Sequence, residues 1–225
     1  LHDALPISIT SLSAFPGFTI HEIDRHGRQM GQTELADIDK DGDLDYVVGA
    51  SGTMWWYEFR SADEWIRHDI GEGAVTDVGG CVMDVDQDGW PDVVTGTGWY
   101  RNTGNPRKEP FVLYLTGAIE THDNVPVDIN GDGKLDILAC SNDEPHPYLN
   151  WYEIPEDPKS AWKEYRIGPG IHGGVDPVGF GDLDMDGDMD VARGDAWFEN
   201  LDGKGTKWEM HHELIPRSEE RRVGK

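Results

Sequence analysis

Residues 182–190 read Asp-Leu-Asp-Met-Asp-Gly-Asp-Met-Asp, with carboxylates at positions 1, 3, 5 and 9 of a short loop and a glycine at position 6. Acidic side chains at alternate positions of a tight turn converge on a hard cation such as Ca²⁺, and the glycine permits the bend. Without a metal, carboxylates this close together would repel one another. The stretch therefore predicts a calcium-binding loop.

The same loop occurs three more times, so the chain has loop 1 (37–45), loop 2 (84–92), loop 3 (128–136) and loop 4 (182–190). In each we expect the side chains at positions 1, 3, 5 and 9 and the backbone carbonyl at position 7 to bind the metal. The expected ligands are Asp37, Asp39, Asp41, Asp43, Asp45, Asp84, Asp86, Asp88, Trp90, Asp92, Asp128, Asn130, Asp132, Lys134, Asp136, Asp182, Asp184, Asp186, Asp188 and Asp190. About four Ca²⁺ ions follow, and a metal that recurs in every unit is expected to be structural.

Two aromatic signals repeat with the loops, at intervals typical of repeat architectures. An aromatic pair follows each loop, and an aromatic-x-x-His/Tyr signature precedes each loop and returns near the end. The pairs begin at Trp56, Trp99, Trp151 and Trp197, and the signatures at Phe18, Trp65, Phe111, Trp162 and Trp208. Each unit reads as four short strands, which we call A to D. In the first unit these are Thr33–Asp37, Asp45–Ala50, Met54–Arg60 and Glu64–Ile70. Four strands per unit predict the blades of an all-β propeller.

On these motifs the chain resembles the FG-GAP/VCBS repeat family, whose members include the integrin α-subunit propeller. The resemblance covers roughly Phe18 to Leu214, and Gly179-Phe180-Gly181 echoes the family's name. It implies a β-propeller with Ca²⁺ in the A–B hairpin of each blade. An EF-hand is excluded because its loop needs a glutamate at position 12 and flanking helices. Position 12 is occupied here by Val48, Thr95, Ala139 and Arg193.

Residues 1–8 and 217–225 resemble translated sequencing-adapter sequence and are treated as non-native. We expect residues 9–216 to form a partial propeller of four blades, preceded by the D strand of another blade at about 17–24. The blades are expected at about 30–73, 74–118, 119–170 and 171–216. This strand count indicates part of a ring of about seven or eight blades, with an apolar blade face open at each end.

Residues that recur in every blade are interpreted as packing residues, because a repeated side chain serves the blade itself. They are Trp56, Trp99, Trp151, Trp197, His21, His68, Tyr114, Tyr165 and His211. Stacking of some exposed tryptophans on sugars is the alternative. Cys81 and Cys140 are too few for a disulfide framework, and we expect them to be buried small hydrophobic residues rather than a pair.

Function is expected where the repeats differ. The A–B and C–D turns of a four-stranded blade share one face, so the metal loops lie there and the D–A and B–C turns form the opposite, metal-free face. That face is expected to gather Thr76, Asp77, His122, Asp123, His172, Asp176, Arg193, Asp195 and the insertion Ser141–Leu149 with Asp143, Glu144 and His146. The candidate catalytic residues are His122, His172 and Arg193, as a base, an acid and an anion clamp. Polar loop ends without chemistry are the alternative reading.

The chain has 44 acidic and 19 basic residues and a formal net charge of −25, which argues against nucleic acid or an anionic membrane as a partner. No apolar run is long enough for a transmembrane helix, so we expect no membrane insertion. Weak calcium loops fill only where calcium is abundant, which predicts a secreted or cell-surface protein, extracellular or periplasmic.

The leading hypothesis, implied by the resemblance, is a module that binds a glycan or an extracellular protein, with structural Ca²⁺ and with the missing blades of its own parent chain as neighbours. The alternative is the propeller domain of a polysaccharide-degrading enzyme of the lyase type, in which His, Tyr and Arg act next to a neutralised uronate. The third hypothesis is a non-catalytic module of a larger chain. The residues favour a protein that is not an enzyme, but they do not decide between the hypotheses.

Overall fold

The computed structural model describes residues 17, 19–25, 30–50, 52–74, 79–118, 121–141, 146–171 and 179–212, with the side chains of residues 30, 32, 33 and 122 outside the description. Within these residues the chain forms four separate antiparallel sheets of four strands each. In every sheet neighbouring strands are consecutive in the chain. The predicted all-β fold of four-stranded blades is confirmed.

The strands lie close to the ranges that the sequence indicates. Blade 1 consists of β1 (Met30–Ala36), β2 (Asp45–Ala50), β3 (Thr53–Ser61) and β4 (Glu64–Glu72). Blade 2 consists of β5 (Cys81–Met83), β6 (Asp92–Thr95), β7 (Gly98–Arg101) and β8 (Val112–Leu115). Blade 3 consists of β9 (Thr121–Val127), β10 (Asp136–Ser141), β11 (Tyr148–Glu153) and β12 (Lys163–Pro169). Blade 4 consists of β13 (Phe180–Gly181), β14 (Asp190–Arg193), β15 (Ala196–Asn200) and β16 (Trp208–His211).

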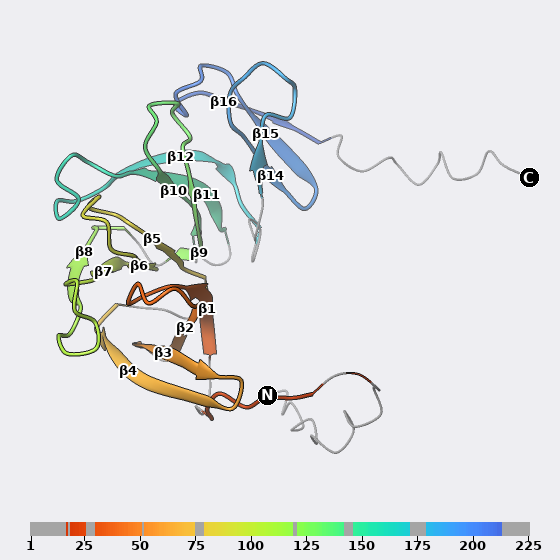
Figure 1. Ribbon diagram of the computed structural model, residues 1–225. Coiled ribbons are helices and arrows are strands. Elements are labelled where there is room, and N and C mark those ends of the chain that lie inside the picture. The colour runs from red at the N-terminus through yellow and green to blue at the C-terminus, as the bar shows by residue number, and fades with distance from the viewer. Residues whose placement is uncertain are drawn as a thin grey trace, which may run out of the picture.

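The blades follow one another along an arc, with blade 1 and blade 4 at its two ends (Figure 1). The A strands of neighbouring blades approach each other, since β1 contacts β5 and β5 contacts β9. The B–C turn of a blade lies beside the segment that follows its D strand: Gly73 N–H donates to the Gly52 carbonyl at 3.3 Å, and Gly170 N–H donates to the Pro147 carbonyl at 2.8 Å. These turns share one face, as the blade topology predicts.

Each blade has two apolar faces because successive strand residues point to opposite sides. In blade 1 the cross-strand pair Val47 and Trp56 lies on one face, and the pair Tyr46 and Tyr57 lies on the other. The first face packs against blade 2, so that Val47 and Trp56 share a buried cluster with Tyr100. Equivalent clusters join blade 2 to blade 3 and blade 3 to blade 4. The hydrophobic core is therefore three successive layers between blades.

Blade 4 has no following blade among the described residues. Its forward face, meaning the face that in blades 1 to 3 packs against the next blade, is partly exposed. Leu183 is 44% exposed, whereas its repeat equivalents Ile38 and Ile129 are 0% and 1% exposed. Trp197 is likewise partly exposed, although the equivalent tryptophans of the other blades are buried. Closure of a ring is not seen in the described part of the chain.

The aromatic motifs are explained by a stack that recurs in every blade. The C-strand tryptophan stacks on the His or Tyr of its D strand, with ring centroids 4.3 Å apart for Trp56 and His68 and 4.4 Å apart for Trp197 and His211. In blades 1, 3 and 4 the glutamate two residues after the tryptophan meets the same D-strand residue, as where His68 Nε2 lies 2.9 Å from Glu58 Oε2. The packing role of these residues follows from these contacts. Cys81 and Cys140 are both free and buried, as expected.

The D strand expected at about 17–24 is not found, because residues 19–25 are described and carry no strand. A strand requires a hydrogen-bonded neighbour, and no earlier strand is described for this segment. It lies against blade 1 instead, where Tyr57 Oη donates to Asp24 Oδ2 at 2.9 Å and His21 Nδ1 lies 2.7 Å from Asp63 Oδ1. Among the described residues, no helix is long and apolar enough to span a membrane.

Candidate metal centres

Each loop is wound around the carboxylate at its position 1. This carboxylate accepts a hydrogen bond from the N–H of the position-6 glycine in all four loops, for example at 3.1 Å between Gly42 and Asp37 and at 3.2 Å between Gly187 and Asp182. The four glycines have φ values between 87° and 102°. A side chain is disfavoured in this left-handed conformation, which is why glycine stands at position 6.

The side chains at positions 3 and 5 continue the winding. In loops 1, 3 and 4 the position-3 oxygen accepts from the N–H of position 5, at 2.9 Å for Asn130 and 3.1 Å for Asp184. The position-5 carboxylate accepts from the N–H of position 7, at 2.8 Å for Asp132 and 2.9 Å for Asp186. Each of these carboxylates has further lone pairs, so the same groups can also serve a cation.

Carboxylate oxygens converge in three of the four loops. In each of these loops, three acidic side chains place one oxygen each within 4.8 Å of the others. The sets are Asp37, Asp39 and Asp41; Asp84, Asp86 and Asp92; and Asp182, Asp184 and Asp190. Loop 3 forms no such acidic set among the described residues, because its position 3 is the neutral Asn130.

Position 9 has a structural task that the sequence pattern does not reveal. Both oxygens of Asp45 accept backbone hydrogen bonds at 3.0 Å, one from Ile38 in loop 1 and one from Phe59 near the end of β3. Asp92 and Asp190 do the same in their blades. Burial raises the pKa of the position-9 carboxyls of loops 1 to 3 to about 7, partly opposed by these N–H donors. The residue braces the loop against strand C.

The donor set fits a hard divalent cation. Asp43 Oδ1 and Asp86 Oδ1 are buried and have no hydrogen-bond partner among the described residues. Burial and the adjacent carboxylate of Asp41 raise the pKa of Asp43, and burial and the other loop carboxylates raise the pKa of Asp188. A bound cation would supply the missing partner and relieve the repulsion, and clustered oxygen donors are those that Ca²⁺ prefers.

The side chains around position 7 of the loops have different partners. The Lys40 amine of loop 1 lies over the ring of Trp90, 4.8 Å from its centroid. Lys134 Nζ lies 3.1 Å from Glu156 Oε2. Both oxygens of Asp188 lie 2.6 Å from the place where a Cβ on Gly203 would stand, so the C–D turn of blade 4 passes directly over loop 4.

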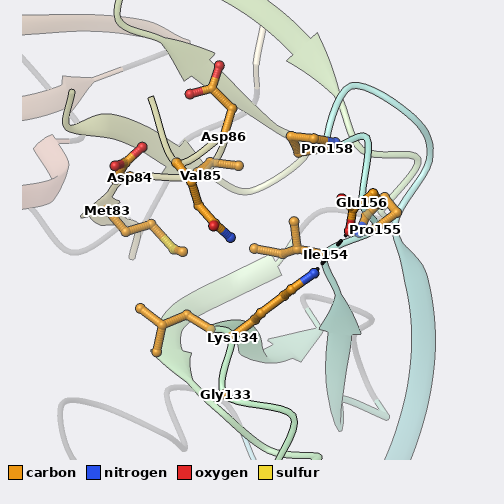
Figure 2. Close-up of a pocket in the computed structure, with 12 residues that line it drawn as sticks. Met83, Asp84, Val85, Asp86, Gly133, Lys134, Ile154, Pro155, Glu156 and Pro158 are labelled. Atoms are coloured by element: carbon orange, nitrogen blue, oxygen red, sulfur yellow. Dashed lines mark hydrogen bonds and ion pairs between the residues drawn. The ribbon is translucent and has the colours of Figure 1, made fainter. Parts of the chain in front are cut away.

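A cavity of about 360 Å³ lies between loop 2 and loop 3. Asp84 and Asp86 line one side, and Lys134 extends across the other side toward Glu156 (Figure 2). This cavity is on the metal-loop face, whereas a ligand site was expected on the metal-free face. Most of the residues expected on that second face lie outside the described residues, namely Thr76, Asp77, Asp143, Glu144, His172 and Asp176.

The three candidate catalytic residues are not brought together by what the structure describes. His172 lies outside the described residues, and the side chain of His122 is likewise not described. The Arg193 side chain is only 7% exposed and is held by Asp195, with Nε 2.8 Å from Oδ1, and by the Pro169 carbonyl. This arginine bridges blade 4 to the end of β12. Elsewhere on the face, Asp123 is buried and His146 is exposed.

Two kinds of contact between blades escaped the sequence reasoning. The amides of Asn102 and Asn200, at the end of strand C in blades 2 and 4, donate to the carbonyls of Ile38 and Ile129 in the preceding blades, at 3.0 and 3.3 Å. Arg107 reaches from blade 2 to the carboxylates of loop 1. The available signal for the first contact is the recurrence of asparagine three residues after a C-strand tryptophan, at Asn102 and Asn200.

A family model described as FG-GAP-like repeat matches three overlapping segments, residues 37–95, 84–139 and 128–192. Every match begins at position 1 of one metal loop and runs through the next loop into the B strand that follows it. Together the matches cover more than half of the chain. A search of curated proteins found no match.

Proposed function

The chain belongs to the FG-GAP-like repeat family, and from this premise we propose that it is a calcium-binding repeat module in which the metal holds each A–B hairpin in shape. The observation that carries the proposal is the convergence of three carboxylates in loops 1, 2 and 4. This role is structural and needs no catalytic residue, because the side chains at positions 1, 3 and 5 already shape the loop that the metal would fill.

Calcium is the cation that suits these loops. Its preferred ligands are carboxylate and carbonyl oxygens in a flexible arrangement, whereas Mg²⁺ demands stricter octahedral geometry and keeps more of its water. The side chains at positions 1, 3 and 5 would hold the ion, and the position-9 carboxylate would contribute where it reaches the set, as Asp92 and Asp190 do. Bound calcium would supply charge neutralisation and cross-linking of strands A and B.

We further propose that the module works outside the cytoplasm and binds a glycan or an extracellular protein. Loops of exposed carboxylates bind calcium weakly, and such sites fill where calcium is millimolar. The strongly negative chain disfavours polyanions as partners. The exposed forward face of blade 4, with Leu183 and Trp197, supports the proposal that further blades of a parent propeller pack there.

The metal proposal is tested by elemental analysis and thermal melting of the full chain. Calcium at one hundred times its Kd should stabilise the folded state by about 2.7 kcal/mol per site relative to chelator. For a chain of this size, one such site corresponds to a shift in melting temperature of about 5 to 10 °C. Equal melting temperatures in millimolar calcium and in chelator, with no calcium retained after gel filtration, would refute it.

The partner proposal needs a separate measurement. Affinity electrophoresis against acidic and neutral polysaccharides, with and without calcium, should show retardation by at least one glycan if the glycan arm is correct. Migration unaffected by every polysaccharide rejects that arm. Cleavage of an acidic polysaccharide, detected by the absorbance of a newly formed unsaturated uronate, would instead favour the lyase alternative.

A further inference from the structure

A guanidinium group occupies part of loop 1. Arg107, in the segment between β7 and β8 of blade 2, places Nη2 2.5 Å from Asp39 Oδ2 and 2.6 Å from Asp41 Oδ2. The same nitrogen lies 2.5 Å from Glu58 Oε1, which also pairs with Arg60. The side chains of Asp39 and Glu58 are only 2% exposed, so this arginine neutralises buried charge at position 3 of the loop and on Glu58, and also pairs with the more exposed Asp41 at position 5.

A different arginine does the same in loop 2. Arg101, the last residue of β7, contacts Asp86 through Nε and Asp88 through Nη2, again positions 3 and 5. Its place in the repeat is notable, because the residue two positions after the C-strand tryptophan is Glu58, Glu153 and Glu199 in the other three blades. Blade 2 therefore carries a positive charge beside its metal loop where each of the other blades carries a carboxylate.

Loops 3 and 4 have no such partner among the described residues. In loop 3, Lys134 turns away from its own loop and pairs with Glu156 across the cavity (Figure 2). The five aspartates of loop 4 make no ion pair with a lysine or an arginine in the described part of the chain. Loop 4 therefore has the largest uncompensated negative charge, whereas loop 3 has only three aspartates, because Asn130 stands at position 3 and Lys134 at position 7.

These charges act directly on cation affinity. A divalent ion entering loop 1 or loop 2 must either displace the guanidinium from positions 3 and 5 or bind beside its positive charge. Loop sites of this kind vary in affinity over orders of magnitude with the number of charged ligands. An arginine on two ligands consequently weakens the site without abolishing it.

We propose that the four loops form two classes of calcium site, and that Arg101 and Arg107 separate them by pairing with the position-3 and position-5 carboxylates of loops 2 and 1. Loop 4 is the tight site and the other three loops are weaker, loops 1 and 2 because of their arginines and loop 3 because it has only three aspartates. The inference rests on the proposed function, since it concerns how the same loops differ.

Calcium titration calorimetry on the chelator-stripped full chain tests the proposal. Wild-type protein should show one tight site and weaker sites separated by about tenfold or more in Kd. Asp186→Asn should remove the tight class. Arg101→Gln should tighten one weak site by about tenfold, and Arg101→Glu, which restores the residue type of the other blades, should tighten it at least as much.

Loop 2 has its own reporter, because Trp90 at position 7 can sensitise luminescence of terbium bound there. The terbium midpoint should fall in Arg101→Gln, and the signal should be lost in Trp90→Phe. The matched control is Arg166→Gln, which removes the same charge from an exposed arginine whose guanidinium carbon lies 3.6 Å from the ring centroid of Tyr148 in blade 3. Its calcium isotherm should match the wild type.

The outcomes separate the two proposals. Four equivalent sites in the wild type, or equal isotherms for Arg101→Gln and Arg166→Gln, overturn the two-class assignment while leaving the calcium module intact. No calcium binding at any loop in millimolar calcium refutes the proposed function itself. Only Arg101 variants are used for the test, because Arg107 also neutralises Glu58, so that replacing Arg107 affects folding as well as calcium binding.

Discussion

Replacement of Asn200 by alanine tests the contact that joins blade 4 to blade 3. Asn200 is fully buried, and its side chain makes three hydrogen bonds. Nδ2 donates to the carbonyls of Ile129 and Met189, both at 3.3 Å, and Oδ1 accepts from Gly205 N–H at 3.0 Å. The alanine variant leaves two carbonyls and one N–H buried without these partners.

The expected loss follows from the number of orphaned groups. A buried polar group left without a partner costs about 1–3 kcal/mol, with carbonyls at the lower end because they have two lone pairs. Three such groups give a loss of about 3–4 kcal/mol in the free energy of unfolding. Asn102→Ala should cost a similar amount, because its amide reaches the Ile38 and Pro91 carbonyls and its Oδ1 accepts from Gly104 N–H.

Urea denaturation in saturating calcium, followed by tryptophan fluorescence, measures this loss. Asn105→Ala is the control, since its exposed amide meets only Glu109, at 3.3 Å, and a change within about 0.5 kcal/mol is expected. A loss below about 1 kcal/mol for both Asn102→Ala and Asn200→Ala would show that the buried amides do not hold neighbouring blades together.

Three further outcomes are expected. Calcium-free protein should become more stable as pH falls from about 7 toward 4.5. The position-9 carboxyls of loops 1 to 3 have pKa values of about 7 in the folded state and 3.8 ordinarily, so the folded state binds more protons in this window. Melting temperatures in chelator that fall on acidification would contradict this. Gly205→Ala should lower the free energy of unfolding, measured by urea denaturation, by about 3 kcal/mol, because φ is 64° and a Cβ would stand 2.6 Å from Ile129 Cγ2. Gly52→Ala is the control and should cost about 1 kcal/mol, from backbone strain at positive φ alone. Trp151→Phe should lose more stability in the same assay than Trp197→Phe, because the buried Trp151 indole donates to the Gly205 carbonyl at 2.8 Å; equal losses would mean that the blade 4 face is not open.

The local parts of the fold were predictable because each repeats. The glycine at position 6 and the alternating aspartates specify the turn, and the aromatic pairs mark strand C, so the strands of blade 1 were placed to within about three residues. For the same reason the sequence predicts packing roles for Trp56 and His68, and the structure shows that they pack as a stacked pair. These features depend on short-range sequence, and four copies make the pattern unambiguous.

The remaining parts depend on which residues the stacking of blades brings together. Arg107 meets Asp41 across 66 positions of sequence, and nothing in either local pattern specifies that contact. The sequence predicts Asp45 as a metal ligand but does not reveal that it braces the loop, because only the structure shows the Ile38 and Phe59 N–H groups that donate to it. The strand expected at about 17–24 is not formed by residues 19–25, with which no described strand pairs.

The contacts within a blade and the contacts between blades are made by different groups, and this determines which parts of the molecule a substitution destabilises. Calcium in a loop would join strands A and B of one blade, whereas the buried amides, the tryptophan N–H groups and the apolar layers join one blade to the next. Loss of the metal from loop 4, as in Asp186→Ala, should therefore loosen blade 4 and leave the other loops' sites unchanged. Loop 1 is the exception, because Arg107 ties its carboxylates to blade 2. Calcium there must either displace Arg107, which releases one of the links between blades 1 and 2, or bind beside its positive charge, so filling loop 1 carries a cost that filling loop 4 does not.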